Sequence, residues 1–526
     1  MSRALWETWD PSSPSATQAV ANGTPRLSNS IVFIDRRGRG VPPDRSALLA
    51  ETAQSLSVDD QSPATNSTRE RCRPPVDTNS SAHAATIAEL CSAGQTGAPV
   101  RTWFVLDPGN SSVTSLPCVF KFLGMPLTQS REISAASRLD NVRYAIRDLA
   151  CVADEVIKQG HKILPLNIGD PLTFDFQTPA HMIEAVYKAM REGKNGYAPS
   201  SGIREALDAI RGEAERKGIT NIRDVFVTSG VSETVDICLA ALVNPGENIL
   251  TPSPDYPLYS AVLAKLGIDL NTYDLNEDDG WQPDLLDVNR KISPRTRAIV
   301  LINPNNPTGS VCSRRMLESI AELARRHNLV IFADEIYDKL ILDDDQHISI
   351  AAIAPDVPVV TFGGLSKNYL APGWRIGWGV VSGEAAAVRP YVEGINRLLR
   401  ARLCANHPEQ YAIKAALEGP QDHLVEVRSK LRSRRDLTVS WCNSTPRVSC
   451  VSPRGAFYAY PRLDIPEDDA VFVKELILQK HVMVVHGSGF GQKAGTKHFR
   501  IVFLPDEKTL TNAYQGIADF IRERYQ

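Results

Sequence analysis

Residues 298–335 read AIVLINPNNPTGSVCSRRMLESIAELARRHNLVIFADE, which is two apolar runs separated by a stretch of helical length. The runs AIVLINP (298–304) and LVIFADE (329–335) are almost continuously apolar, as is typical of strands that are buried on both faces. The stretch between them, SRRMLESIAELARRHN (313–328), has the length and the charged surface of a crossover helix. The three segments together predict two parallel strands joined by a helix.

The same alternation extends over much of the chain. Further strand candidates are VFVTSG (225–230), NILTP (248–252) and PVVTFGG (358–364), with helix-length stretches between several of them. We therefore expect an α/β fold, in which a three-layer α/β/α large domain contains a mainly parallel sheet covered by helices on both faces. After about residue 430 the pattern changes to AFYAYPRL (456–463), HVMVVHG (481–487) and FRIVFLP (499–505), which look like antiparallel strands of a smaller α+β domain.

The beginning of the chain has a different composition. Residues 1 to about 130 are rich in Ser, Thr, Pro and Arg without sustained periodicity, which indicates disorder. From Ala135 onward, apolar residues at helical spacing predict an amphipathic helix. The expected divisions are a disordered extension (1–133), an N-terminal helix and arm that pack on the small domain (134–176), the large domain (177–429) and the small domain (430–526).

Composition excludes several classes of function. The chain has 526 residues, 43% of them hydrophobic and 23% charged, with a net charge of −3, so nothing favours nucleic acid or an anionic membrane as a partner. No apolar run approaches the ~20 residues that a membrane helix needs, and the N-terminus does not resemble a secretory signal. Nine cysteines without a CxxC pair favour reduced thiols in a cytoplasmic protein, and no metal site is predicted.

The most unusual residue is Lys367, in the apolar, glycine-rich run FGGLSKNYLAPGWRIGWGV (362–380). A solvated lysine at a strand–helix turn is the ordinary interpretation, because lysine is rarely buried. The alternative is a lysine in a dry pocket, where its neutral amine can attack a carbonyl carbon. The residues that the chain brings to the same place decide between the two.

Polar residues follow the predicted parallel strands, at the edge of the sheet where ligands bind. Asp334 ends an apolar strand, where a carboxylate must meet a cation or serve as an N-cap, and Tyr337 follows three residues later. The turn NPNNPTG fixes Asn306, either as turn chemistry alone or as an amide held for a ligand. Residues 229–232 (SGVS) place backbone N–H groups and hydroxyls at a helix start, and Arg375 suits a phosphate dianion. A lysine, a carboxylate, an amide, a phenol and a phosphate cup are what pyridoxal phosphate requires.

The motifs NPNNPTG, ADEIYD and SKNYLAPGWRIG together resemble the class I/II aminotransferase family, which has fold type I of the pyridoxal-phosphate enzymes. The resemblance covers about residues 134–526. The stretches LNIGDP, SPDYPLY, RLCAN and SCVSPRGAFYAYP are similar to the bacterial glutamate–pyruvate (alanine) aminotransferases within that family. The resemblance implies transfer of an amino group between an L-amino acid, alanine first, and a 2-oxo acid such as 2-oxoglutarate or pyruvate. It also implies a homodimer with shared active sites.

The resemblance assigns roles to particular residues. Three are catalytic: Lys367 links covalently to the cofactor and moves the substrate proton, Asp334 pairs with the ring nitrogen, and Tyr337 holds the ring oxygen. Substrate binding falls to Arg500, which takes the α-carboxylate, with Asn306 and the backbone of Gly169 beside it. The remaining cofactor contacts are Asn306 on the ring oxygen, Tyr256 on the ring face, and Val231, Ser232, Ser366, Arg375 and Tyr197 (from the neighbouring subunit) on the phosphate.

Several alternatives stay open. The substrate could be aspartate or an aromatic amino acid, and Arg400 or Arg402 could bind a distal carboxylate or belong to a basic helix face. Some regulators join an aminotransferase-like domain to an N-terminal DNA-binding module, but residues 1–124 lack the patterned helices that such a module needs. We expect these residues to be an appendage, with Met125 as the initiator of the functional protein.

Overall fold

The computed structural model describes residues 87–93, 99–105, 133–142, 149–343 and 346–525 of the chain. The chain divides into two compact units, Met1–Gln129 and Ser130–Gln526. In the first unit, strands β1 (Ile87–Ala93) and β2 (Pro99–Val105) pair antiparallel, with Ile87 opposite Val105. The sequence did not predict this pair, and most of the segment 1–133 that was expected to be disordered lies outside the described residues.

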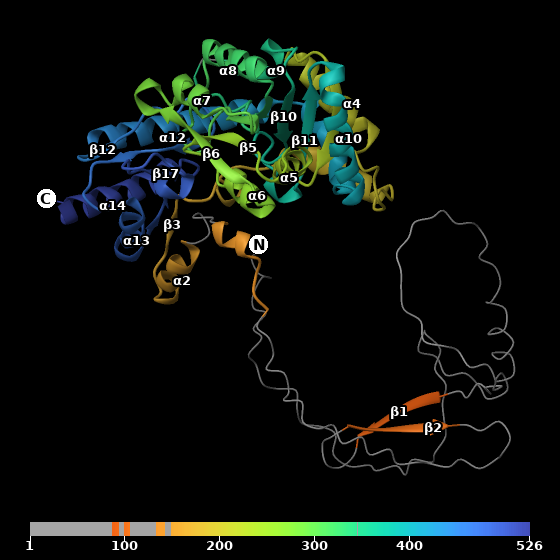
Figure 1. Cartoon of the computed structure of the whole chain (residues 1–526). Helices are drawn as coiled ribbons and strands as arrows, with labels where there is room; N and C mark the ends of the chain where they lie inside the picture. The colour runs from red at the N-terminus through yellow and green to blue at the C-terminus, as the bar shows by residue number, and fades with distance from the viewer. Residues whose placement is uncertain (1–86, 94–98, 106–132, 143–148, 344–345, 526) are drawn as a thin grey trace. The chain divides into compact units, whose positions relative to one another are not determined.

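An eight-stranded sheet forms the centre of the second unit, in the order β4-β11-β10-β9-β8-β5-β6-β7 (Figure 1). Strands β10, β9, β8, β5 and β6 are mutually parallel, whereas β11 runs antiparallel between β10 and β4, and β7 antiparallel to β6. The bounds are β4 (Ile222–Thr228), β5 (Asn248–Ser253), β6 (Asp269–Asn276), β7 (Gln282–Pro283), β8 (Thr296–Ile302), β9 (Val330–Asp334), β10 (Val359–Gly364) and β11 (Gly377–Ser382). The expected α/β fold with a mainly parallel sheet is confirmed.

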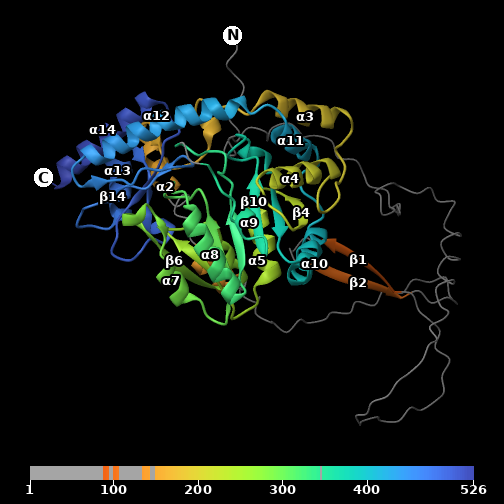
Figure 2. The ribbon, with the colours of Figure 1, turned by 90° about the horizontal axis from the view of Figure 1, so that it is seen from above.

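Helices cover both faces of the sheet because successive strand residues point to opposite sides. In β9, Phe332 packs into one hydrophobic cluster, while Ile331 and Ala333 pack into the other. Helices α5 (Val231–Leu242), α6 (Leu258–Leu266) and α10 (Ala385–Ala401) cover the Phe332 face. The opposite face is covered by α3 (Ala180–Arg191), α4 (Arg204–Arg216), α7 (Leu285–Lys291), α8 (Arg314–His327), α9 (Ile350–Ile353) and α11 (His407–Glu418), with α3 and α4 both contacting α11 (Figure 2).

The C-terminal part joins long helices to short strands. Its elements are α12 (Asp422–Ser444), β12 (Val448–Ser449), β13 (Tyr458–Ala459), β14 (Arg462–Leu463), α13 (Asp469–Lys480), β15 (Val482–Met483), β16 (Val485–His486), β17 (Phe499–Val502) and α14 (Glu507–Tyr525). Strand β17 pairs antiparallel with both β13 and β16, as the sequence pattern indicated. Strand β15 instead pairs parallel with β3 (Leu164–Pro165) from the N-terminal arm.

The described parts of the predicted N-terminal helix are a short turn and a helix, and residues 143–148 between them lie outside the described residues. Residues Ser137–Asn141 form a 3₁₀ turn, η2, and helix α2 covers Ala150–Lys158. Leu139 and Val142, expected on a buried helix face, are partly exposed, and the Nε of Arg138 instead donates a hydrogen bond to the carbonyl of Lys265. This hydrogen bond ties the 3₁₀ turn to α6, which lies 127 residues further along the chain. Helix α2 lies against α13.

Among the described residues, no helix combines the length and the apolar character needed to cross a membrane.

Candidate active site

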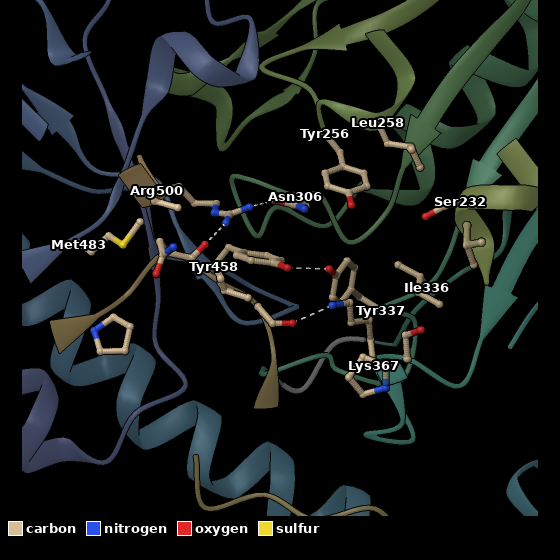
Figure 3. A pocket seen from close by; sticks show the side chains of 18 of the residues that line it. Ser232, Tyr256, Leu258, Asn306, Ile336, Tyr337, Lys367, Tyr458, Met483 and Arg500 are labelled. Carbon is tan, nitrogen blue, oxygen red and sulfur yellow. Dashed lines mark hydrogen bonds between the residues drawn. The ribbon is translucent and has the colours of Figure 1, made fainter. Parts of the chain in front are cut away.

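A cavity of about 910 Å³ opens at the carboxyl ends of the parallel strands, between the large sheet and the C-terminal part (Figure 3). The structure places all but one of the site residues predicted from the sequence on its wall. These are Gly169, Val231, Ser232, Tyr256, Asn306, Asp334, Tyr337, Ser366, Lys367, Arg375 and Arg500. Tyr197 does not line the cavity and is 81% exposed.

Lys367 lies in the loop that follows β10 and points into the cavity (Figure 3). Its Nζ donates a hydrogen bond to the carbonyl of Gly169 at 2.8 Å. Burial lowers the pKa of Lys367 to about 8, and the positive charges of Arg500 and Arg375 act in the same direction, whereas Asp170 opposes them. Part of this amine is therefore neutral near physiological pH, which fits the dry-pocket interpretation rather than a solvated lysine.

Asp334 occupies the last position of β9 and is buried. The hydroxyl of Tyr259 donates a hydrogen bond to its Oδ2 at 2.9 Å, and burial raises the pKa of Asp334 to about 6. No helix begins here, because residues 336–339 form turns, but the Oδ1 of Asp334 accepts a hydrogen bond from the backbone N–H of Ile336 at 3.4 Å and so also caps the turn. A buried carboxylate at the floor of a cavity can hold the cationic form of a ligand ring.

Arg500 lies on β17 and is almost completely buried. Its Nη1 donates to the Oδ1 of Asn306 at 3.1 Å, and its Nη2 donates to the carbonyl of Asn167. The guanidinium carbon lies 4.7 Å from the ring centroid of Tyr458 and 4.8 Å from that of Phe490. Two rings and two hydrogen bonds thus fix the plane of a cation whose shape matches a carboxylate.

The other end of the cavity is suited to an anion. Helix α5 begins at Val231 without a side-chain cap, and its first residues, Val231 and Ser232, line the cavity, so the start of the helix is suited to bind an anion. Gly230 precedes the helix with φ of 82°, and a Cβ there would lie 2.4 Å from Nη2 of Arg375. A Cβ on Gly377 would lie 2.4 Å from the nitrogen of Val231. The absence of these two side chains lets Arg375 and β11 approach the helix end, where Ser366 adds a hydroxyl.

The tyrosines form the wall between these two ends. The hydroxyl of Tyr337 lies 2.8 Å from that of Tyr458, and burial raises the pKa of Tyr337 well above its usual value, so it remains a phenol. Tyr256 lies on the opposite wall (Figure 3).

Three contributors were missed in the sequence. Tyr259 lies three residues after Tyr256 in SPDYPLY, and that helical spacing was a usable signal. Tyr458 in GAFYAYP and Asn167 in LNIGDP offered none, because the first is defined by a tertiary partner and the second acts through its backbone carbonyl.

Neither of the two arginines considered for a distal carboxylate lines the cavity. Arg402 donates to the carbonyl of Val227 at 2.6 Å and lies 3.4 Å from Glu233, so it supports the strand before α5. Arg400 is exposed on α10.

Comparison with known proteins agrees with this geometry. Residues 161–517 match the family "Aminotransferase class I and II". The chain is 40% identical over 403 residues to the glutamate-pyruvate aminotransferase AlaA of Escherichia coli K12, which covers 75% of this chain and 99% of AlaA. It is 41% identical over 404 residues to the alanine aminotransferase of Mycobacterium tuberculosis, covering 75% and 94% of the two chains.

Solved structures give the same result. An alanine aminotransferase from Pyrococcus furiosus superposes with a TM-score of 0.72 at 42% identity, over 74% of this chain and all of the other. An aminotransferase from Escherichia coli gives a TM-score of 0.73 at 40% identity, over 75% and 100% of the two chains. The chain therefore belongs to the class I and II aminotransferases and is a transaminase.

Proposed function

We propose that this transaminase uses pyridoxal phosphate to move an amino group between L-alanine and a 2-oxo acid, with 2-oxoglutarate or pyruvate as acceptor. The observation that carries the proposal is that Lys367 and Arg500 face one cavity, an amine for the reaction and a guanidinium for the substrate carboxylate. The choice of alanine is supported by the names of relatives at 40% identity or above.

The residues present fit this cofactor. The uncapped start of α5 with Ser232, Ser366 and Arg375 suits its phosphate, and Asp334 suits its ring nitrogen. Asn306 and Tyr337 would hold the ring oxygen, and Tyr256 would cover the ring face. When bound, the cofactor supplies a cationic ring that accepts the electron pair left by removal of the Cα proton.

The protein's own groups then divide the work. Arg500 and Asn306 hold the α-carboxylate and so fix the orientation of Cα. The Nζ of Lys367, neutral in part because of its lowered pKa, would act as the base that takes the proton from the substrate Cα and as the acid that gives it back. Gly169 has no side chain where the Tyr458 hydroxyl and the Phe457 ring approach within 2.4 and 2.8 Å of a Cβ position, so its backbone can close over the carboxylate.

The assembly belongs to the same proposal. We infer a homodimer in the cytoplasm, in which the exposed Tyr197 of each subunit reaches the phosphate of its partner's cofactor. We retain 177–429 and 430–526 as the large and small domains, with 134–176 as the arm.

A panel of amino donors tests the substrate. Alanine, glutamate, aspartate and tyrosine are each assayed with 2-oxoglutarate and with pyruvate, using the Lys367→Ala variant as the blank. We expect kcat/KM to be highest for alanine with 2-oxoglutarate and for glutamate with pyruvate. Higher values for aspartate or tyrosine would replace alanine by one of those substrates, and no transfer from any donor would overturn the proposal.

A further inference from the structure

The phenol of Tyr458 touches three parts of the site at once (Figure 3). Its hydroxyl lies 2.8 Å from that of Tyr337, and its ring packs under the guanidinium of Arg500. The same hydroxyl lies 2.4 Å from the position that a Cβ on Gly169 would occupy, so only glycine fits there. Tyr458 is 2% exposed and comes from β13, whereas Tyr337 follows β9, so the contact joins the C-terminal part to the large sheet.

Either of the two phenols, Tyr337 or Tyr458, can be the donor in the hydrogen bond between them. Each hydroxyl can donate one hydrogen bond and accept two. At 2.8 Å one of the two hydroxyls must donate to the other. If Tyr337 donates to Tyr458, Tyr337 has no hydrogen left for a ligand oxygen in the cavity. If Tyr458 donates, the hydrogen of Tyr337 is available to a ligand oxygen in the cavity.

We propose that Tyr458 is a positioning residue that donates its hydrogen to the Oη of Tyr337 and thereby directs the Tyr337 hydrogen to the ring oxygen of the cofactor. This inference rests on the proposed function, because it takes the ligand of Tyr337 to be pyridoxal phosphate. The ring of Tyr458 has a separate task, which is to keep the plane of Arg500. The hydroxyl of Tyr458 therefore affects cofactor binding through Tyr337, and its ring affects substrate binding through Arg500.

The variant Tyr458→Phe separates these tasks because it removes the hydroxyl and keeps the ring. Tyr514→Phe is the matched control: Tyr514 is also buried in the C-terminal part and its hydroxyl lies 2.6 Å from that of Thr438, remote from the cavity lining. Both variants lose one buried hydroxyl–hydroxyl bond, so urea unfolding reports the structural cost that they share.

Three readouts on the pure proteins test the role. In Tyr458→Phe we expect the affinity of the apoprotein for pyridoxal phosphate to weaken about fivefold, as for the loss of one neutral hydrogen bond. We expect kcat to fall by about the same factor while KM for the amino acid stays within about twofold, because the Arg500 clamp is retained. The pH at which the absorbance of the lysine-linked cofactor changes should move upward, because a weaker donor at the ring oxygen stabilises its anionic form less. Tyr514→Phe should change none of the three.

A double variant completes the test. If Tyr458 acts only through Tyr337, the affinity for pyridoxal phosphate of the Tyr337→Phe/Tyr458→Phe protein should equal that of Tyr337→Phe alone. Additive losses, an unchanged spectral midpoint, or a midpoint that moves downward would each overturn the proposal, the last because it would mean that Tyr337 was the donor. Failure here leaves the proposed function standing as long as Lys367→Ala abolishes turnover, so the two outcomes are distinguishable.

Discussion

Lys367 must lose a proton before it can react, and its surroundings set the pH at which it does so. Its pKa lies near 8, lowered by burial and by two arginines against the opposing charge of Asp170. The fraction of Lys367 that is in the neutral amine form therefore increases as pH rises through about 8. We expect the rate at which the apoprotein captures pyridoxal phosphate, followed by absorbance, to rise over that range and then level off.

Replacing the charged neighbour Asp170 by a neutral residue provides the control for that titration. Asp170→Asn keeps an oxygen that can accept from the backbone N–H of Leu172, as Asp170 does at 3.0 Å, and removes the charge that favours the ammonium form. The rise in capture rate should therefore move to lower pH in Asp170→Asn. A capture rate that does not vary with pH in either protein would contradict the lowered pKa.

Arg500 depends on its shape as well as on its charge. Arg500→Lys keeps a cation but loses the plane that lies between two rings and bonds to Asn306 and Asn167. We expect KM to rise about 10- to 100-fold for every amino acid and 2-oxo acid, as for loss of charge-assisted hydrogen bonds to a common α-carboxylate. A rise confined to dicarboxylic substrates would place Arg500 at the distal end of the substrate instead.

Motif residues of the site could be predicted from the sequence, but their partners could not. Lys367, Asp334 and Asn306 stand at strand ends and in a rigid turn, and such positions can be recognised locally. The partners of Tyr337 and Arg500 lie 121 and 333 residues away in the chain, at Tyr458 and Asn167. Such pairs exist only after the sheet and the C-terminal part have come together.

The turn that follows β9 is held by a buried ion cluster. Lys217, directly after α4, bonds to Asp338 and lies 3.4 Å from Glu335, and His347 is close enough to complete a group with metal-ligand chemistry. The charges raise the pKa of Lys217 and, against burial, lower that of Asp338 to about 2. The ammonium of Lys217 thus balances the charge of the two carboxylates, as a metal ion could do in such a group. The cluster holds the turn that connects Asp334 to Tyr337.

Removing Lys217 should therefore be costly. Lys217→Met leaves two buried carboxylates without their cation, and we expect a loss of about 3 kcal/mol in the free energy of unfolding near neutral pH, measured with urea. Because the folded-state pKa of Asp338 is below its ordinary value of 3.8, the stabilisation is present above about pH 4 and disappears as pH falls through about 2.

The exposed Lys414 is a control for the more buried Lys217. Lys414 pairs with Glu418 at 3.8 Å on the surface of α11, so Lys414→Met should change the free energy of unfolding by less than about 0.5 kcal/mol. Equal effects of the two substitutions would show that the Lys217 cluster is not the support described above.

Strands that are buried on both faces were predictable, and those at the margins of the pattern were not. The apolar runs of β8 and β9 are short and rich in β-branched residues, which favours buried strands. Strand β6 reads DLNTYDLN because it lies next to the short edge strand β7, and its polar residues concealed it. Strand β11 contains two glycines that resemble loop residues, although Gly377 is needed so that β11 can approach α5.

At the scale of the whole molecule, the site depends on an N-terminal arm that lies far from it in sequence. Strand β3 pairs with β15 in parallel, and this pairing brings Asn167 to Arg500 and Gly169 to Lys367. The arm therefore belongs to the functional body, although its strand β3 ends more than fifty residues before β4, the first strand of the large sheet, begins. A cut that removes it should abolish the reaction.

Where the functional body begins can be tested by truncation. Known relatives are covered over 94–100% of their length by about three quarters of this chain, and the unit that contains the cavity starts at Ser130. We expect a chain that begins at Met125 to bind pyridoxal phosphate and to transaminate with kcat/KM within about twofold of the full chain, because none of the described residues before Ala150 lines the cavity. A chain that begins at Pro179 lacks α2, β3, Asn167 and Gly169 and is the control that should lose activity. If the chain from Met125 were inactive or insoluble, residues before it would have to contribute to the folded enzyme, and the assignment of residues 1–124 as an appendage would be wrong.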